Sequence, residues 1–237
     1  MVTTLYLIRH GDTEGDGVKR YHGSIDVPLS EKGVEQMRTT SAFVAEHLKN
    51  SVSSRNSSYL REVNGRAASG GIGTDYETSG VETAGLSAIY CSDLSRAIRS
   101  AGLIAGPHGL EPVIVPALRE RSFGIWEGMS FADIKERYPG EFESWASDPV
   151  NHSPIEGETT VEVRDRAVPA MDGILRRHNG ENIAVVAHGG INRIILCHIL
   201  GIPLENIFRI EQDFGAVNVI EFWDRYPVVK LVNFRPE

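Results

Sequence analysis

The sequence predicts an α/β fold, a single three-layer domain with a mostly parallel central sheet and helices on both of its faces. Segments rich in apolar and β-branched residues alternate with segments of helical periodicity, as in sheets joined by crossover helices. Hydrophobic residues make up 41% of the chain, enough for a buried core. The length of 237 residues fits one large domain or two small ones, and the unbroken alternation favours one domain over residues 1–237.

The N-terminal half contains three expected strands and two expected helices. The first strand, 3–8, ends at the tripeptide Arg9-His10-Gly11, and the other two strands are 86–91 and 112–115. Ser30 has the side chain of an N-cap for the first helix, and Ser92 with Asp93 is expected to cap the second. The apolar residues of the two helices recur at helical spacing: Val34, Met37, Val44 and Leu48, then Leu94, Ala97, Ile98, Ala101 and Ile104.

The C-terminal half continues the alternation. A helical pattern over 161–178 predicts a long helix, although Pro169 should kink that helix or delay its start. The other expected elements are short helices at 131–138 and 141–145, a strand at 183–187, an apolar helix that ends at Leu200, and strands at 217–222 and 228–234.

Residues 50–85 differ from the rest of the chain. They include seven Ser, six Gly and three Asn and show little periodicity. A segment with so few apolar residues cannot form a core of its own. We therefore expect a Ser/Gly-rich surface insertion within the domain, in preference to a lid over the functional site.

The charge and the cysteine content exclude several classes of protein. The chain has 24 Lys and Arg against 32 Asp and Glu, a formal net charge of −8, which disfavours binding to nucleic acid or to an acidic membrane. Cys91 and Cys197 are too few for a disulfide framework or a zinc cluster. The chain shows neither a membrane-span pattern nor a signal peptide. We expect a cytoplasmic protein, a monomer or a homodimer.

Two histidines stand out because each follows a strand directly. His10 and His188 end the first and fourth expected strands, and a glycine follows each of them. In α/β sheets ligands bind beyond the carboxyl ends of the strands, and glycine permits close approach to the backbone. A single histidine is more often structural than catalytic, and the other six keep that interpretation.

Two arginines and one glutamate have a comparable position. Arg9 precedes His10, and Arg96 lies near the start of a helix, where an anion is favoured over a cation. Both guanidinium groups suit a phosphate or a carboxylate. Glu120 follows the third strand and could deliver a proton to a leaving oxygen; a surface salt bridge with Arg119 or Arg121 is the alternative.

Competing motifs fail on inspection. Residues 12–17 resemble the opening of a calcium loop, but Gly23 stands where a bidentate Glu is required. The chain has no nucleophile elbow of the type G-x-S-x-G, no H-E-x-x-H and no P-loop. The positively charged strand ends therefore fit a tetrahedral oxyanion best.

Ordered blocks of the sequence carry a family resemblance. The chain resembles the histidine phosphatase superfamily, the phosphoglycerate-mutase-like group. The matching blocks are 7–13 (LIRHGDT), 21–33 (YHGSIDVPLSEKG), 90–97 (YCSDLSRA), 118–128 (LRERSFGIWEG), 157–159 (GET) and 186–190 (VAHGG). Because these blocks occur in the family's order and cover nearly the whole chain except 50–85, chance similarity is excluded.

The resemblance implies a role for each site residue. His10 would be the nucleophile that becomes a phosphohistidine, and Glu120 would be the general acid and then the base for water. The phosphoryl oxygens would be held by Arg9, Arg96 and His188. The pocket lining implied by the resemblance comprises Thr13, Gly23 and Gly189. The substrate would be a small phosphorylated metabolite, and neither a metal nor another cofactor would be required.

One position departs from the family pattern. Many members carry Asn six residues after the nucleophile, where this chain has Asp16. A carboxylate repels phosphate, so Asp16 must turn away, stay protonated or face another part of the substrate. The departure concerns the mouth of the site and leaves the core residues unchanged.

The resemblance favours hydrolysis over isomerisation. Residues 123–128 are similar to those of phosphatase members, including the α-ribazole-phosphate phosphatases, and the long phosphoglycerate-mutase segment after the acid block is not recognisable. A cofactor-dependent phosphoglycerate mutase and a non-catalytic phosphate-binding protein remain the alternatives. We expect a metal-independent phosphomonoester hydrolase, with α-ribazole 5′-phosphate among its candidate substrates.

Overall fold

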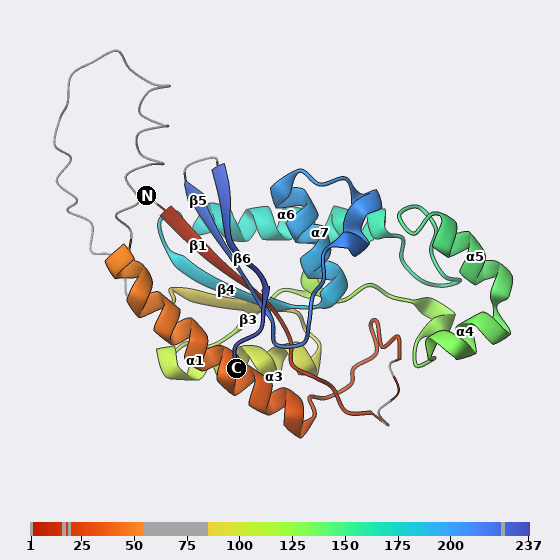
Figure 1. The fold of residues 1–237 in the computed structure, drawn as a ribbon, viewed down its shortest axis with the longest axis horizontal. Coiled ribbons are helices and arrows are strands. Elements are labelled where there is room, and N and C mark those ends of the chain that lie inside the picture. The colour runs from red at the N-terminus through yellow and green to blue at the C-terminus, as the bar shows by residue number, and fades with distance from the viewer. Residues whose placement is uncertain (1, 16–17, 19, 55–84, 224–225) are drawn as a thin grey trace, which may run out of the picture.

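A computed structural model describes residues 2–15, 18, 20–54, 85–223 and 226–237 (Figure 1). Within these residues six strands form one mixed sheet in the order β3-β2-β4-β1-β5-β6. Strands β1 to β4 pair in parallel, while β5 is antiparallel to β1 and β6 to β5. The strand bounds are β1 Val2–Arg9, β2 Ala88–Cys91, β3 Val113–Ile114, β4 Asn182–Ala187, β5 Val217–Trp223 and β6 Tyr226–Phe234.

The helices complete the three-layer architecture that the sequence predicts. Helices α1 and α3 cover one face of the sheet, and α6 and α7 cover the other (Figure 1). The helix bounds are α1 Glu31–Ser54, α3 Ser95–Ala105, α4 Phe131–Arg137, α5 Pro139–Ser147, α6 Thr160–Arg177 and α7 Gly189–Leu200. Short 3-10 turns cover η1 Gly106–His108, η2 Pro116–Leu118, η3 Gly124–Trp126 and η4 Leu204–Arg209.

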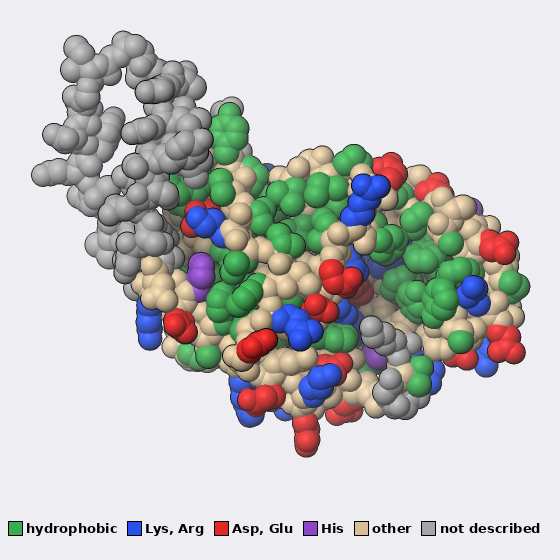
Figure 2. All heavy atoms as spheres, in the orientation of Figure 1, with side chains coloured by type: hydrophobic (Ala, Val, Ile, Leu, Met, Phe, Trp, Pro, Cys, Tyr) green, Lys and Arg blue, Asp and Glu red, His purple; other side chains and the backbone are tan. Residues whose placement is uncertain are grey.

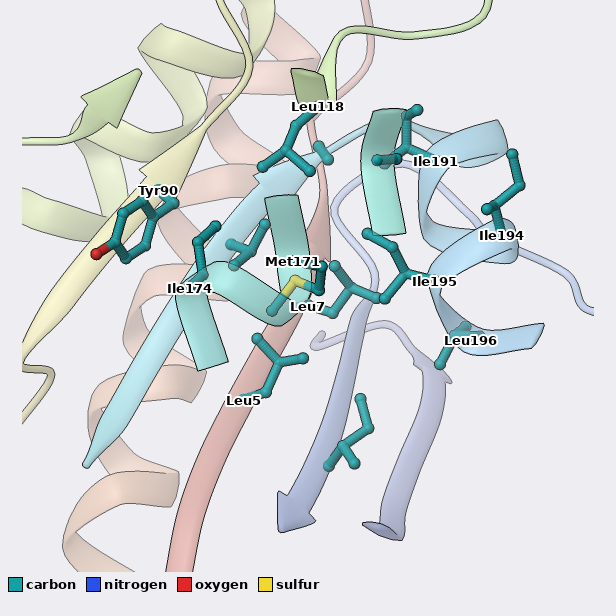
Figure 3. Packing of buried hydrophobic residues seen from close by; sticks show 14 of the residues in the cluster. Leu5, Leu7, Tyr90, Leu118, Met171, Ile174, Ile191, Ile194, Ile195 and Leu196 are labelled. Atoms are coloured by element: carbon teal, nitrogen blue, oxygen red, sulfur yellow. The ribbon is translucent and has the colours of Figure 1, made fainter. Parts of the chain in front are cut away.

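Strand β1 lies at the centre of the core because its side chains are buried on both faces. Leu5 and Leu7 pack toward α6 and α7, as Figure 3 shows, whereas Tyr6 and Ile8 belong to the cluster beneath α1 and α3. Alternate residues of a strand point to opposite faces, which explains this division. Complete burial of one such side chain contributes roughly 1.5–3 kcal/mol, so the two clusters fix the position of β1.

Most of the predicted elements are confirmed, and the differences concern helix starts. Ser30 accepts a hydrogen bond from the Gly33 amide (3.0 Å), as expected of a cap. The predicted cap by Ser92 and Asp93 is wrong, because α3 begins after Leu94 and has no side-chain cap. Pro169 lies inside α6 without delaying its start, which a capping box between Thr159 and Glu162 stabilises.

The predicted insertion at residues 50–85 overlaps a helix at its start. Helix α1 continues to Ser54, so residues 50–54 are helical, and residues 55–84 lie outside the described part of the chain. None of the helices in the described part has the length and apolar character needed to cross a lipid bilayer.

Helices α4 and α5 form a lobe beside the sheet. Within it, the rings of Trp126 and Trp145 meet edge to face at 5.7 Å, and Phe142 contacts both of them. Hydrophobic side chains gather on this lobe, and acidic and basic side chains lie where it meets the sheet domain (Figure 2). The lobe therefore lies beside the region of the sheet where the parallel strands reach their carboxyl ends.

The loop after β1 is held against α1 by two glycines. A Cβ atom on Gly33 would overlap the backbone oxygen of Asp12, and one on Gly11 would overlap the backbone oxygen of Gly33. Both contacts are with main-chain atoms, which cannot rotate away. Glycine at these positions lets the loop that begins at His10 pack directly on the first turn of α1.

We predict that Gly33→Ala destabilises the protein by about 1–3 kcal/mol, because the added methyl group must displace the backbone of the loop. Chemical denaturation monitored by circular dichroism measures the change. Gly102→Ala is the matched control, since a Cβ atom at Gly102 in α3 meets nothing within 4 Å. Helix propensity should make that variant as stable as the wild type or more so. Equal stability of both variants would contradict the packing argument.

Candidate active site

The carboxyl ends of three parallel strands bring the candidate residues together. In the register of the sheet, Arg9 pairs with Ala187 and Cys91 pairs with Val186. The residues that follow these strands are therefore neighbours. The His10 amide donates to the Ala187 carbonyl (3.0 Å), and the rings of His10 and His188 have their centroids 5.0 Å apart. The structure thus unites the two histidines that the sequence singled out.

The hydrogen bond of His10 defines which of its nitrogens can react. Its Nδ1 lies 2.7 Å from the Gly11 carbonyl oxygen, which can only accept, so Nδ1 carries the proton. The pKa of His10 lies well below its ordinary value, because the ring is buried and because Arg9 and Arg96 are close. His10 is therefore a neutral imidazole with a free lone pair on Nε2.

His188 is completely buried and bonded on one side only. Its Nε2 lies 2.6 Å from the Ser92 hydroxyl, whereas its buried Nδ1 has no hydrogen-bond partner in the described part of the chain. Burial, followed by the proximity of His10 and Arg96, lowers its pKa well below the ordinary value. A buried polar atom without a partner costs about 1–3 kcal/mol, a cost that a bound ligand can remove.

Arg9 is held by a carbonyl and an aromatic ring. Its guanidinium donates to the Gln212 carbonyl and lies 3.8 Å from the centroid of the Phe214 ring, a cation–π contact. The same ring lies 5.5 Å from that of His10. Burial lowers the pKa of Arg9 to about 10, so the side chain is a cation at neutral pH. Its buried Nε has no partner among the described residues.

Arg96 connects the first turn of α3 to the loop that contains Gly23. Its guanidinium donates to the carbonyl oxygens of Ile25 (2.6 Å) and Gly23 (2.7 Å). Gly23 has a φ of +50°, and a Cβ atom there would overlap a carboxylate oxygen of Glu127. The structure therefore places Gly23 as a partner of Arg96, and direct contact of Gly23 with substrate stays a prediction.

Glu120 lies at the N-terminus of α7. Its two carboxylate oxygens accept hydrogen bonds from the amides of Gly190 (2.9 Å) and Arg121 (2.9 Å). The alternative of a surface salt bridge is not what the structure shows. Arg119 pairs with Asp93 at 2.7 Å, and the Arg121 guanidinium binds carbonyl oxygens and the Thr160 hydroxyl.

Gly189 and Gly190, which follow His188, leave room for the side chains of Arg9 and Glu120. A Cβ atom on Gly189 would lie 3.3 Å from the guanidinium carbon of Arg9, and one on Gly190 would lie 2.6 Å from Glu120 Oε1. Any larger residue would push the arginine or the glutamate aside. The pair thus allows the Arg9 cation and the Glu120 carboxylate to pack on the start of α7, where the backbone amides favour an anion.

A cavity of about 880 Å³ adjoins the strand ends and includes two of the predicted residues, Arg9 and Thr13. The Thr13 hydroxyl is 3.5 Å from His22 Nδ1 at its edge. The cavity has a mixed lining of basic and acidic side chains: Arg9, Arg20 and Lys32, and Asp12, Glu14, Glu31, Glu211 and Asp213. Asp16, which departs from the family pattern, lies outside the described residues.

Sequence reasoning missed three residues of this neighbourhood. Ser92 was assigned to a helix cap, although it follows a parallel strand just as His10 and His188 do, and that signal could have identified it. His22 was treated as structural, yet it lines the cavity. Phe214 carries no sequence signal, because its contacts with Arg9 and His10 depend on the packing of a distant loop.

The described residues contain no group of three or more His, Cys, Asp or Glu side chains arranged to hold a metal ion. The ionisable groups that the structure does bring together are two arginines, two neutral histidines and one carboxylate. Such an arrangement can bind a tetrahedral anion, attack it with an imidazole and exchange a proton with a leaving oxygen.

Comparisons with known proteins give matches to a family profile and to named phosphatases. The sequence profile of the histidine phosphatase superfamily (branch 1) matches residues 5–62 and 79–235. Phosphoserine phosphatase 1 of Hydrogenobacter thermophilus is 26% identical over 97% of this chain and 91% of its own length. The adenosylcobalamin/alpha-ribazole phosphatase of Escherichia coli is 24% identical over 98% of this chain and 96% of its own.

Solved structures share the fold. A putative alpha-ribazole-5′-P phosphatase from Escherichia coli superposes with a TM-score of 0.74 at 23% identity, covering 98% of this chain and 97% of that one. A protein described as mycobacterial hydrolase 2 gives a TM-score of 0.77 at 20% identity, covering 100% and 92%. At this level of identity the likeness concerns the fold alone.

We predict that stability falls as the pH drops below 6.5. The unfolded chain takes up a proton on each histidine near its ordinary pKa of about 6.5, whereas folded His10 and His188 stay neutral to lower pH. The stabilisation is complete above pH 6.5 and decreases below it, by up to about 1.4 kcal/mol per pH unit for each histidine. Urea titrations between pH 7.5 and 5 measure this slope.

His188→Gln should reduce the slope, because it removes one of the two histidines whose pKa lies well below the ordinary value in the folded protein. Ser41→Ala removes a buried hydroxyl that donates to the Leu103 carbonyl, but no titratable group, and controls for general destabilisation. A slope in His188→Gln equal to that of the wild type would refute the assignment.

Proposed function

The chain belongs to the histidine phosphatase superfamily, and from this premise we propose that it hydrolyses the phosphomonoester of a small metabolite through a phosphohistidine at His10. The observation that carries the proposal is the hydrogen bond from His10 Nδ1 to the Gly11 carbonyl, which leaves Nε2 free as a nucleophile. His188, with an unpartnered Nδ1 of its own, lies beside that ring.

In the first step the lone pair of His10 Nε2 attacks phosphorus, and the bond between phosphorus and the ester oxygen breaks. A protonated Glu120 gives its proton to the departing oxygen, so that an alcohol leaves. The Gly11 carbonyl continues to accept from Nδ1–H and stabilises the charge that develops on the ring. Dividing the reaction into two transfers lowers the barrier of each.

In the second step water attacks the phosphohistidine. Glu120, now a carboxylate, takes a proton from the water, the P–N bond breaks, and inorganic phosphate leaves with His10 restored. The phosphoryl oxygens carry negative charge throughout, and we assign their stabilisation to Arg9, Arg96 and His188. Thr13, Gly23 and the Gly189 amide complete the proposed binding site.

Hydrolysis is supported over isomerisation by the names of the relatives. Both relatives described above are named as phosphatases, one as phosphoserine phosphatase 1 and the other as adenosylcobalamin/alpha-ribazole phosphatase. We take phosphoserine and α-ribazole 5′-phosphate as the leading candidate substrates. We also propose a cytoplasmic monomer or homodimer without nucleic-acid or membrane partners, in keeping with the two buried, unpaired cysteines.

A panel of phosphomonoesters tests the proposal. It contains both candidates, 3-phosphoglycerate, fructose bisphosphates and an aryl phosphate, with phosphate release and product structure measured together. Release of phosphate from at least one metabolite supports a phosphatase. Isomerisation of 3-phosphoglycerate without release would instead indicate a mutase, and binding without turnover of any compound would indicate a phosphate-binding protein.

We predict that His10→Ala lowers phosphate release by roughly 10⁴-fold or more, because it removes the nucleophile of the proposed covalent intermediate. Rapid acid-free quenching with a ³²P-labelled substrate should trap label on the wild type and none on the variant. A metal chelator should leave the wild-type rate unchanged. His198→Ala, which removes a surface histidine paired with Asp172, is the matched control. Labelled His10→Ala would place the nucleophile elsewhere.

We predict that Glu120→Gln slows hydrolysis in proportion to the basicity of the leaving group. Alkyl phosphates need a proton on the departing oxygen and should lose about 10²- to 10⁴-fold in kcat/KM. Activated aryl phosphates leave without that proton and should lose far less. Glu136→Gln, in exposed α4, is the control. An equal loss for both substrate classes would exclude the acid role of Glu120.

A further inference from the structure

Ser92 is placed to determine the hydrogen bonding of the His188 ring. Its hydroxyl lies 2.6 Å from His188 Nε2, and neither residue is accessible to solvent. The two residues follow neighbouring parallel strands, β2 and β4, so their contact is fixed by the sheet. Because water cannot reach the pair, the serine is the partner that decides how this ring nitrogen is bonded.

The surroundings of Ser92 set the direction of that hydrogen bond. The Leu94 amide donates to the Ser92 oxygen at 3.4 Å. The hydroxyl proton has no other acceptor among the described residues, so the arrangement that satisfies it directs it at His188 Nε2, which then accepts. A neutral imidazole with an accepting Nε2 carries its proton on Nδ1. The buried, unpartnered Nδ1 of His188 is thus a donor.

We propose that Ser92 is a positioning residue that holds His188 in the Nδ1-protonated tautomer, so that an N–H group is directed at the phosphoryl group. The inference rests on the proposed function of the site. The opposite tautomer would present a lone pair to the phosphoryl oxygens and repel them. The tautomer of His10 is also fixed by a hydrogen bond, since the Gly11 carbonyl holds the proton on Nδ1 of His10.

The groups that fix the two tautomers differ, because one is a hydrogen-bond acceptor and the other is a donor. A carbonyl acceptor holds the proton of His10 on Nδ1 and leaves Nε2 as a nucleophile. A hydroxyl donor occupies Nε2 of His188 and leaves Nδ1–H as an electrophilic group. Since burial and the neighbouring cations keep both rings neutral, protonation cannot supply the missing N–H of His188.

The first test is spectroscopic and needs no activity. The protein is labelled with ¹⁵N-histidine, and the His188 signals are identified by their loss in His188→Gln. In the wild type the ¹⁵N shifts should show a protonated Nδ1 and a bare Nε2. In Ser92→Ala the proton should move wholly or partly to Nε2. A wild-type proton on Nε2, or an unchanged tautomer in Ser92→Ala, would overturn the proposal.

The second test is kinetic. Ser92→Ala should lower kcat/KM for an aryl phosphate by about 10- to 100-fold, as is typical of partners that orient functional histidines. Orthovanadate should bind more weakly by a similar factor. Ser92→Thr, which restores the hydroxyl, should recover most of both losses. Ser41→Ala, another buried serine whose hydroxyl donates to a carbonyl, should keep wild-type kinetics.

The two tests distinguish a failure of the positioning role of Ser92 from a failure of the proposed function. A loss below twofold in Ser92→Ala, or no recovery in a folded Ser92→Thr, would refute the positioning role even though the wild type hydrolyses the ester. If Ser92→Ala does not fold, the wild-type spectrum still decides the tautomer. Absence of hydrolysis by the wild type would instead contradict the proposed function and leave the spectroscopic result standing.

Discussion

The parallel register of β1, β2 and β4 is the constraint on which the site depends. It makes the three strands end side by side, so that His10, Ser92 and His188 meet although they are far apart in sequence. A shift of one residue would turn every side chain of a strand to the other face of the sheet. The hydrophobic clusters on both faces prevent this shift. Core packing therefore determines the geometry of the chemistry.

The arginines of the site are bound by backbone dipoles, which preserves their charge. Arg9 and Arg96 donate to the carbonyl oxygens of Gln212, Ile25 and Gly23. Several arginines elsewhere in the described chain pair with carboxylates, as in the contact of Arg166 with Glu158 (2.8 Å). A carboxylate partner would cancel the positive potential, whereas carbonyl groups fix the guanidinium and leave its attraction for an anion.

The fold and the core of the site could be predicted because their signals are local. Strand ends followed by glycine identified His10 and His188, and the elements of the sheet follow from hydrophobic pattern alone. The function of Ser92 was not predicted, because a serine before a helix has two possible partners and the helix-cap interpretation needs no tertiary contact. Phe214 was not predictable, since its ring reaches Arg9 only through the packing of the loop before β5.

The cations of the site have two effects that serve one reaction. In the proposed reaction Arg9 and Arg96 attract a phosphoryl group. Burial, together with these same charges, lowers the pKa of His10 and keeps its Nε2 free of a proton. Separate groups for binding the phosphoryl group and for keeping His10 unprotonated are then unnecessary. In the proposed mechanism, phosphorus bound to Nε2 would place the anionic group among those cations while the Gly11 carbonyl accepts from Nδ1–H. The electrostatics that suppress protonation of His10 would thus favour the proposed phosphorylation.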